Sequence, residues 1–307
     1  MGHPESDTQE ARAAIARIEG FEDLAQTPVV ERLGGLTNRV WRLGEGDRAV
    51  VLRLPGKGTE TYIDRAAEAV NARAAAQAGV SPRVLHFGAD GVMLTEYIPR
   101  TTTMTPAAFA TRDGAVERAA LAFRRLHTRA APFAGRFELF AMIDNYLKVL
   151  AELGATLPPG YHDVVAEAGP LRAALDASPA PIAPCHCDPL CENFLDTDER
   201  MWIVDWEYSG NNDPLWDLGD LSVEGAFTED MDLRLLTAYF DRDPTPAEHG
   251  RMVIHKAMCD LLWTLWGLIQ HANHNPAEDF WAYAITRFER CRALMASPEF
   301  ARHRAAL

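Results

Sequence analysis

The first hundred residues contain short apolar runs that are separated by turn-forming residues. Runs of this length, in which apolar residues cluster or alternate and which end at glycine or proline, are typical of β-strands. The predicted strands are residues 29–34, 39–44, 47–56, 83–88 and 91–98. Residues 62–79 are instead rich in alanine and end at Gly79, which predicts a helix. We therefore expect a β-rich N-terminal lobe that contains one helix.

The pattern changes after Pro99, where longer stretches with helical periodicity begin. A Thr-Pro pair at residues 105–106 is typical of a helix start, and helical stretches make up most of the remaining chain. Pro170 is expected to interrupt the helix predicted over residues 163–175. Short strands are predicted at residues 181–186, 193–196 and 201–206. The sequence thus predicts an α+β protein with a mostly helical C-terminal lobe.

Composition and charge agree with a protein of two lobes, which we place at residues 1–98 and 99–307. The net charge of −14 argues against a nucleic-acid partner, because such a partner needs a basic surface. The N-terminus lacks the features of a secretory signal. No apolar stretch is expected to cross a membrane, since the best candidate, residues 257–270, is short and contains Asp260. Five cysteines, an odd number, do not fit a disulfide framework, so we expect a cytoplasmic protein with reduced thiols.

A histidine, two aspartates and an asparagine have the spacing of a kinase catalytic loop. His186, Asp188 and Asn193 form an H-x-D-x-x-x-x-N pattern, and Asp205 follows at the end of a predicted strand. In such a loop the aspartate accepts the proton of the substrate hydroxyl, and the asparagine and the second aspartate bind Mg²⁺. The alternative is a solvated turn that happens to be acidic. The order of the motif behind a β-rich lobe favours the kinase interpretation.

Three cysteines in the same stretch raise the alternative of a metal-thiolate site. Cys185, Cys187 and Cys191 lack a C-x-x-C pair, and no second ligand pair with standard zinc spacing follows. We therefore interpret them as small buried thiols.

The N-terminal lobe offers candidate phosphate-binding residues. A glycine-rich turn between two predicted strands contains Gly35, Thr37 and Asn38, and its backbone can approach phosphates, although such turns are often simple hairpins. Arg53 lies within the third strand, where a kinase places its phosphate-binding lysine, and Glu68 on the next helix is its expected partner. The alternative is an incidental surface pair, which would contribute little.

Aromatic residues near the C-terminus indicate a cation-binding pocket. Trp263 and Trp266 are three residues apart and share one face of a predicted helix, and Tyr208 and Tyr283 are expected to join them. Indole faces attract alkylammonium groups. Glu224 is expected to neutralise the same cation. An aromatic stripe of this kind is otherwise part of a hydrophobic core.

These motifs together resemble the choline/ethanolamine kinase family of the aminoglycoside-phosphotransferase-like, protein-kinase-like superfamily. The supporting segments are HCDPLCENFL, IVDWEYSGNNDPLWDLGDLSVE, LTNRVWRL, VVLRLPGKGTE, IDRAAEA and LLWTLWGLIQ. The resemblance implies a two-lobed protein-kinase-like fold, the cofactors ATP and Mg²⁺, and a small amino-alcohol substrate, above all choline.

The resemblance also implies a role for each matching residue. Asp188 would be the catalytic base, His186 would brace the loop, and Asn193 and Asp205 would bind magnesium. The nucleotide would contact Arg53 and the inter-lobe segment from Glu96 to Ile98. The substrate ammonium would be bound by Tyr208, Glu224, Trp263, Trp266 and Tyr283.

The chain departs from eukaryotic family members in the segment SGNNDPLWDLGD, which leaves the acceptor less certain than the reaction. Ethanolamine, thiamine and an aminoglycoside are alternative acceptors, and a non-catalytic cation-binding protein is a further alternative. Glu207 and Asp217 match acidic positions of the family that have no assigned role in this interpretation.

Overall fold

The N-terminal lobe is built on a five-stranded antiparallel sheet. The computed structural model describes residues 4–34, 38–56 and 63–307. The strands of the sheet lie in the order β1-β2-β3-β5-β4. Their bounds are β1 Val30–Gly34, β2 Arg39–Leu43, β3 Val50–Leu54, β4 Val84–Phe87 and β5 Met93–Glu96. All five strands and the helix α2 (Arg65–Gln77) agree with the sequence prediction.

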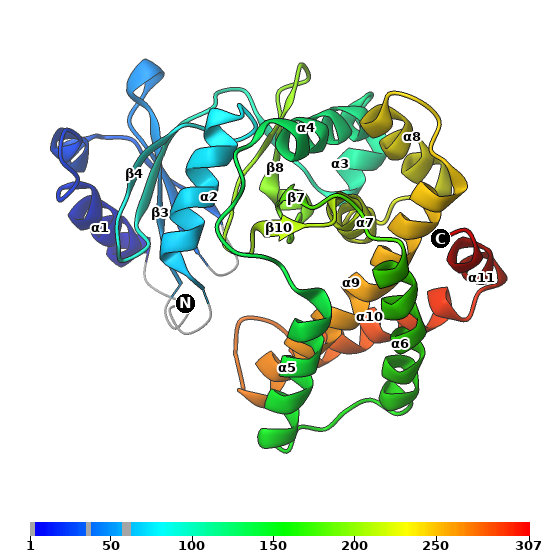
Figure 1. The fold of residues 1–307 in the computed structure, drawn as a ribbon. Helices are drawn as coiled ribbons and strands as arrows, with labels where there is room; N and C mark the ends of the chain where they lie inside the picture. The colour runs from blue at the N-terminus through cyan, green and yellow to red at the C-terminus, as the bar shows by residue number, and fades with distance from the viewer. Residues whose placement is uncertain (1–3, 35–37, 57–62) are drawn as a thin grey trace.

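Side chains along β3 alternate between the two faces of the sheet. One face packs against an apolar cluster, and the other carries Arg53. Leu52 and Leu54 belong to an apolar cluster shared with helix α1 (Pro4–Ile15). The side chain of Arg53 points to the opposite face, where it pairs with Glu68 of α2. Figure 1 shows α1 and α2 on the two sides of the sheet. The N-terminal helix was not predicted from the sequence.

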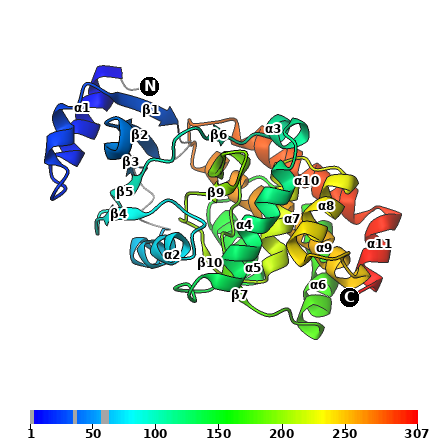
Figure 2. The same ribbon diagram turned by 90° about the horizontal axis from the view of Figure 1, so that it is seen from above.

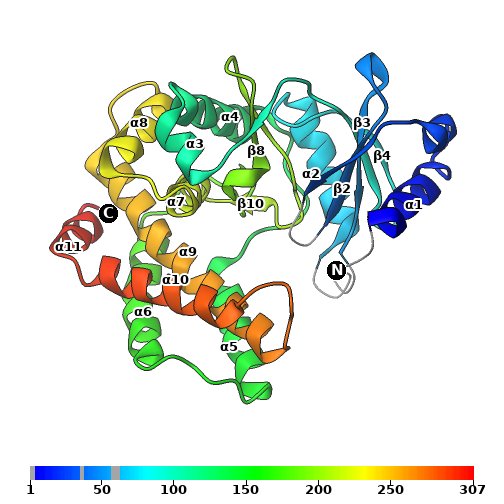
Figure 3. The same ribbon diagram turned by 180° about the vertical axis from the view of Figure 1, so that it is seen from behind.

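The C-terminal lobe is mostly helical and is organised around one long helix, α9 (Pro246–Ala272). The other helices are α3 Pro106–Thr111, α4 Ala115–Arg129, α5 Leu139–Glu152, α6 Tyr161–Ala177, α7 Pro214–Glu224, α8 Glu229–Phe240, α10 Phe280–Met295 and α11 Pro298–Ala305. Helices α7 and α10 pack directly on α9. Figures 2 and 3 show this lobe beside the sheet of the first lobe. The result is a two-lobed α+β architecture.

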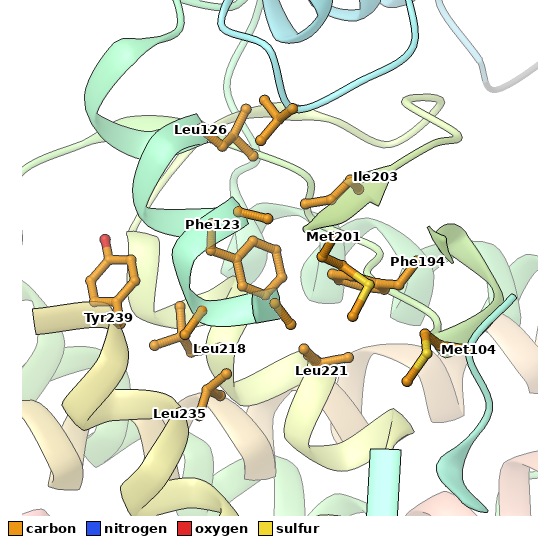
Figure 4. Packing of buried hydrophobic residues seen from close by; sticks show 14 of the residues in the cluster. Met104, Phe123, Leu126, Phe194, Met201, Ile203, Leu218, Leu221, Leu235 and Tyr239 are labelled. Atoms are coloured by element: carbon orange, nitrogen blue, oxygen red, sulfur yellow. The ribbon is translucent and has the colours of Figure 1, made fainter. Parts of the chain in front are cut away.

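Short strands form two small sheets near the junction of the lobes, and strands β6 (Thr102–Thr103) and β8 (Phe194–Asp196) line the space between the lobes. Strand β6 pairs with β8, which also pairs with β9 (Met201–Ile203). A second pair joins β7 (Ala183–Cys185) to β10 (Gly210–Asn212). The β8–β9 hairpin rests on a buried cluster of side chains from α4, α7 and α8 (Figure 4). Labelled members of the cluster are Met104, Phe123, Leu126, Phe194, Met201, Ile203, Leu218, Leu221, Leu235 and Tyr239.

Two expectations about helices require correction. Helix α6 continues through Pro170, which lies on its exposed side, because buried apolar residues at helical spacing before and after it pack into the lobe. The proline costs the helix a hydrogen bond but does not divide it. Helix α9 is long and apolar enough to cross a membrane by length and composition, contrary to expectation, but 83% of its apolar window is buried inside the protein.

A buried ion-pair group fixes the start of α7 to α9. The Asp213 carboxylate caps α7 by accepting a hydrogen bond from the amide of Leu215 at 3.0 Å. It also pairs with Arg251 and with Nε2 of His255, at 2.8 Å, both on α9. Burial alone would raise the pKa of Asp213, but His255 and Arg251 hold it well below its usual range. This group therefore helps to place every functional side chain on α7.

The lowered pKa of Asp213 predicts a loss of stability in acid. A carboxyl whose pKa is lower in the folded state stabilises the protein above its unfolded pKa of about 3.9, and that contribution is lost as the pH falls further. We expect Asp213→Asn to lower the free energy of unfolding by about 3 kcal/mol at pH 7, and by progressively less below about pH 4. Urea unfolding between pH 3 and 7 measures this difference, with exposed Asp243→Asn as the control. A deficit that is independent of pH would contradict the role of the charge.

Candidate active site

A carboxylate on α7 accepts hydrogen bonds from the backbone of the predicted catalytic loop. The two oxygens of Asp217 accept hydrogen bonds from the backbone amides of His186, at 2.7 Å, and Cys187, at 2.8 Å. Nε2 of His127, on α4, also contacts Asp217 at 3.0 Å, and Nδ1 of His127 contacts the hydroxyl of Tyr239 at 2.9 Å. Asp217 is fully buried. It therefore fixes the backbone just before Asp188.

His186 links this loop to the strand end that carries Asp205. Its Nε2 lies 2.9 Å from the carbonyl oxygen of Val204. Burial lowers the pKa of His186, so the ring is neutral near pH 7 and Nε2 carries the proton that it donates. The next residue, Asp205, has a φ of 68°, a left-handed conformation that is uncommon for residues other than glycine. The position of His186 agrees with a bracing role.

Asn193 and Asp205 are brought together by the β8–β9 hairpin. The amide of Val204 donates to the carbonyl of Asn193 at 2.9 Å, and the side-chain amide of Asn193 donates to the carbonyl of Asp188 at 3.2 Å. Desolvation and the neighbouring Glu207 raise the pKa of Asp205 to about 7, although Arg53 opposes this shift. A positively charged ion at this site would stabilise the ionised form of Asp205. Carboxylate and carboxamide oxygens are ligands that Mg²⁺ prefers, so the residues present fit a magnesium ion.

The two lobes contact each other through ion pairs at this point. Arg53 forms a buried pair with Glu68 and lies 3.5 Å from Asp205 and 3.8 Å from Glu207. Arg65, which sequence reasoning missed, pairs with Glu68 at 2.7 Å and also with Glu207. The pair of Arg53 and Glu68 is thus a buried network and not an incidental surface pair. The i, i+3 spacing of Arg65 and Glu68 on α2 was the only sequence signal for the second arginine.

A cavity of about 420 Å³ opens between the lobes beside these residues. Six predicted nucleotide- or metal-binding residues line it, namely Asn38, Arg53, Glu96, Ile98, Asn193 and Asp205. Glu68 lies behind Arg53. Asn38 donates to Asp205 at 3.4 Å and accepts from the amide of Gly56 at 3.2 Å. Gly35 and Thr37 lie outside the described residues.

The aromatic residues named from the sequence form a continuous group in the C-terminal lobe. Ring centroids are 5.5 Å apart for Tyr208 and Trp263, 6.3 Å for Trp263 and Trp266, and 5.8 Å for Trp266 and Tyr283. Gly267 permits the close approach of α10, since a Cβ atom there would lie 2.7 Å from the Tyr283 ring. The four rings thus come from three separate segments of the chain.

Asp188 lies next to Asn193, which lines the cavity and whose side-chain amide donates to the Asp188 carbonyl. Burial raises the pKa of its carboxyl, and repulsion from Glu224 and Asp205 adds to this. A carboxylate with a raised pKa is suited to accept a proton.

Glu224 is not a free carboxylate. It accepts a hydrogen bond from Nη2 of Arg287 at 2.6 Å, and the guanidinium group of Arg287 lies 4.5 Å from the centre of the Tyr283 ring. Arg287 was also missed, because nothing in the sequence shows that residues 63 positions apart form a pair.

The cysteines are free and buried, as predicted. Burial raises the pKa of Cys185 and of Cys187, which disfavours the thiolate that a metal would require. Cys185 lies close to His127 and Asp217, but Asp217 is already bonded to two backbone amides and to His127. Hydrogen bonds account for the contacts of Asp217 in this group.

Comparison with known proteins identifies a family and similar solved structures. The profile of the phosphotransferase enzyme family matches residues 29–252. A choline/ethanolamine kinase family protein from Mesorhizobium loti, known from its crystal structure, is 62% identical in sequence to this chain. The two structures superimpose with a TM-score of 0.92 over 98% of each chain. Choline kinase LicA from Streptococcus pneumoniae is 27% identical, with a TM-score of 0.77 over 94% of this chain and 99% of that chain. A structure of LicA in complex with AMP is 25% identical, with a TM-score of 0.74 over 96% and 99%.

The support of the catalytic loop by Asp217 can be tested without a substrate. Asp217→Asn keeps the shape of the side chain but replaces one acceptor oxygen with a donor. We expect the free energy of unfolding to fall by about 2 to 3 kcal/mol and the amides of residues 186 and 187 to exchange faster with solvent.

Hydrogen exchange followed by mass spectrometry measures the second effect. The control is Asp232→Asn, another buried acid, which pairs with Lys256 away from the loop. This variant should lose stability while exchange at residues 185–191 stays unchanged. Equal exchange in both variants would contradict the anchoring role of Asp217.

Proposed function

Because the chain belongs to the choline/ethanolamine kinase family of phosphotransferases, we propose that it transfers the γ-phosphoryl group of ATP to the hydroxyl of choline. The observation that carries this proposal is the placement of Asp188 beside Asn193, which lines the inter-lobe cavity and donates to the Asp188 carbonyl at 3.2 Å. The carboxylate of Asp188 is also close enough to Asp205 and to Glu224 for their charges to raise its pKa. A hydroxyl and a phosphoryl group could therefore meet beside Asp188.

The inter-lobe cavity is the proposed ATP site. Arg53, oriented by Glu68, would pair with phosphates, and the turn that includes Gly35, Thr37 and Asn38 would add donors. The backbone from Glu96 to Ile98 would meet the base. Asn193 and Asp205 would bind Mg²⁺, whose charge would offset that of the phosphates. The crystal structure of the related LicA in complex with AMP supports nucleotide binding by this fold.

The protein's own contribution to the reaction is positioning and proton acceptance. Asp188 would orient the choline hydroxyl towards the γ-phosphoryl group and accept its proton, a role that its raised pKa favours. His186 and Asp217 would hold this geometry without touching the substrate. Phosphoryl transfer needs little covalent help, so alignment in a closed cleft supplies much of the rate enhancement.

The aromatic group supports an acceptor with an alkylammonium head. The faces of Tyr208, Trp263 and Trp266 would hold the cation, and each such contact contributes about 0.5 to 2 kcal/mol when desolvated. The likeness to choline kinase LicA supports choline as the acceptor. Five free thiols agree with a reducing compartment, and we place the reaction in the cytoplasm.

Removal of the proposed base should stop the reaction while nucleotide binding persists. We expect Asp188→Ala to lower kcat by about 10²- to 10⁴-fold and to change the Kd of Mg·ATP only a few-fold, because Asp188 would contact the acceptor. Coupled ADP release and calorimetry measure the two quantities. Glu199→Ala, on the exposed β8–β9 turn, serves as the control. Near-normal turnover by Asp188→Ala would exclude it as the base.

The acceptor is tested by ADP release with choline, ethanolamine, thiamine and kanamycin. We expect selective turnover of choline and, in Trp263→Ala, a KM for choline raised about tenfold or more. Trp281→Ala, a tryptophan of α10 that contacts His271 outside the aromatic group, should keep the wild-type KM. Preference for another acceptor would overturn choline as substrate but not the phosphotransferase chemistry. Absence of turnover with all four would favour the non-catalytic alternative.

A further inference from the structure

We propose that Asp220, and not Glu224, supplies the negative charge that recognises the cationic head of the substrate. This proposal rests on the proposed function and deepens it, because it identifies the residue that distinguishes a cationic alcohol from a neutral one of the same shape. Asp220 lies on α7, one helical turn before Glu224, so the two side chains share a face of the helix.

Glu224 and one face of the aromatic group are already occupied by a cation of the protein itself. Arg287 bonds to Glu224 at 2.6 Å, and its guanidinium group lies over the Tyr283 ring at 4.5 Å. The side chain of Arg287 is only 7% exposed, so this pair is not weakened by solvent. A substrate ammonium would have to displace a buried arginine to use Glu224.

Asp260, the third acidic residue of this region, is also paired with arginine side chains. Asp260, on α9, accepts hydrogen bonds from Arg290 at 2.6 Å and 2.5 Å and lies 3.5 Å from Arg287. Two guanidinium groups therefore compensate its charge. Neither Asp260 nor Glu224 is left to meet a cation from outside the protein.

Asp220 differs from both acids because no cationic side chain of the described residues pairs with it. It is fully buried, and its Oδ1 accepts only a weak hydrogen bond from the Cys259 thiol at 3.1 Å. Its Oδ2 has no hydrogen-bond partner within the described ranges. Burial of such a group is costly, and an unsatisfied buried carboxyl requires an explanation.

A cation would stabilise the ionised form of Asp220, which its surroundings disfavour. Burial raises its pKa and repulsion from Glu224 and Asp188 adds to this, although the Cys259 thiol and Arg287 oppose the shift. The nearest ligand atoms of Asp220, Glu224 and Cys259 lie within 4.8 Å of one another. Asp220 is thus next to Glu224, the carboxylate that holds Arg287 against Tyr283. A substrate ammonium in this region would complete the charge balance that the protein leaves open.

The decisive comparison uses choline and its uncharged isostere, 3,3-dimethylbutan-1-ol. We expect Asp220→Asn to reduce the ratio of kcat/KM for choline to that for the isostere by about 10- to 100-fold, since one contact to a charged group is lost. Glu224→Gln should affect both alcohols alike, because it acts through Arg287. Asp260→Asn, the matched acid with arginine partners, should leave the ratio unchanged. An unchanged ratio in Asp220→Asn would overturn the proposal.

Binding of tetramethylammonium, measured by calorimetry, separates this proposal from the proposed function. Loss of binding in Asp220→Asn, with retention in Glu224→Gln, would support Asp220 even if choline were not phosphorylated. Equal binding by both variants would overturn it, whatever the acceptor. Should Asp220→Asn fail to fold, as judged by thermal unfolding, Asp220→Ser provides the same comparison in a side chain of neutral charge.

Discussion

The predicted catalytic loop depends on one buried carboxylate that accepts hydrogen bonds from two backbone amides. Asp217 bonds to the amides of His186 and Cys187 and thereby joins α7 to the loop. His186 then extends this order to Val204, next to Asp205. A single chain of hydrogen bonds therefore relates the proposed base to the proposed metal ligand. The hydrogen bonds to the buried charge of Asp217 are strong and directional, and the bond from the neutral His186 ring lies next to Asp205, which adopts a left-handed conformation.

Charge is distributed between the lobes in a complementary way. The N-terminal lobe contributes Arg53 and Arg65, and the C-terminal lobe contributes Asp205 and Glu207. The interface between lobes is thus a set of ion pairs, in which Asp205 would bind the metal ion and Arg53 would bind phosphate. With Mg·ATP bound, Asp205 and Arg53 would each exchange a protein partner for a ligand partner of the same charge as that protein partner.

Sequence reasoning succeeded for the fold, because the five strands of the first sheet and the helical second lobe depend on residues that are near one another in the chain. The structure also brings together the residues of the H-x-D-x-x-x-x-N loop, and their roles stay predictions. Sequence reasoning failed where two interacting residues are far apart in the chain, as for Arg287 and Glu224. It also missed Asp220, because no sequence pattern shows that Oδ2 of a buried carboxylate has no hydrogen-bond partner among the described residues. The helix break expected at Pro170 does not occur, because the packing of α6 into the lobe outweighs the local preference of proline for a break.

The aromatic residues on α9 and α10 belong to elements that contribute nothing to the described lining of the nucleotide cavity. In the proposed function, choice of acceptor and binding of phosphate would therefore depend on different parts of the chain. A substitution at Trp263, Trp266 or Tyr283 would alter which alcohol is bound and leave the residues that line the inter-lobe cavity in place. Acceptor preference could then change without loss of the ion pairs that join the two lobes.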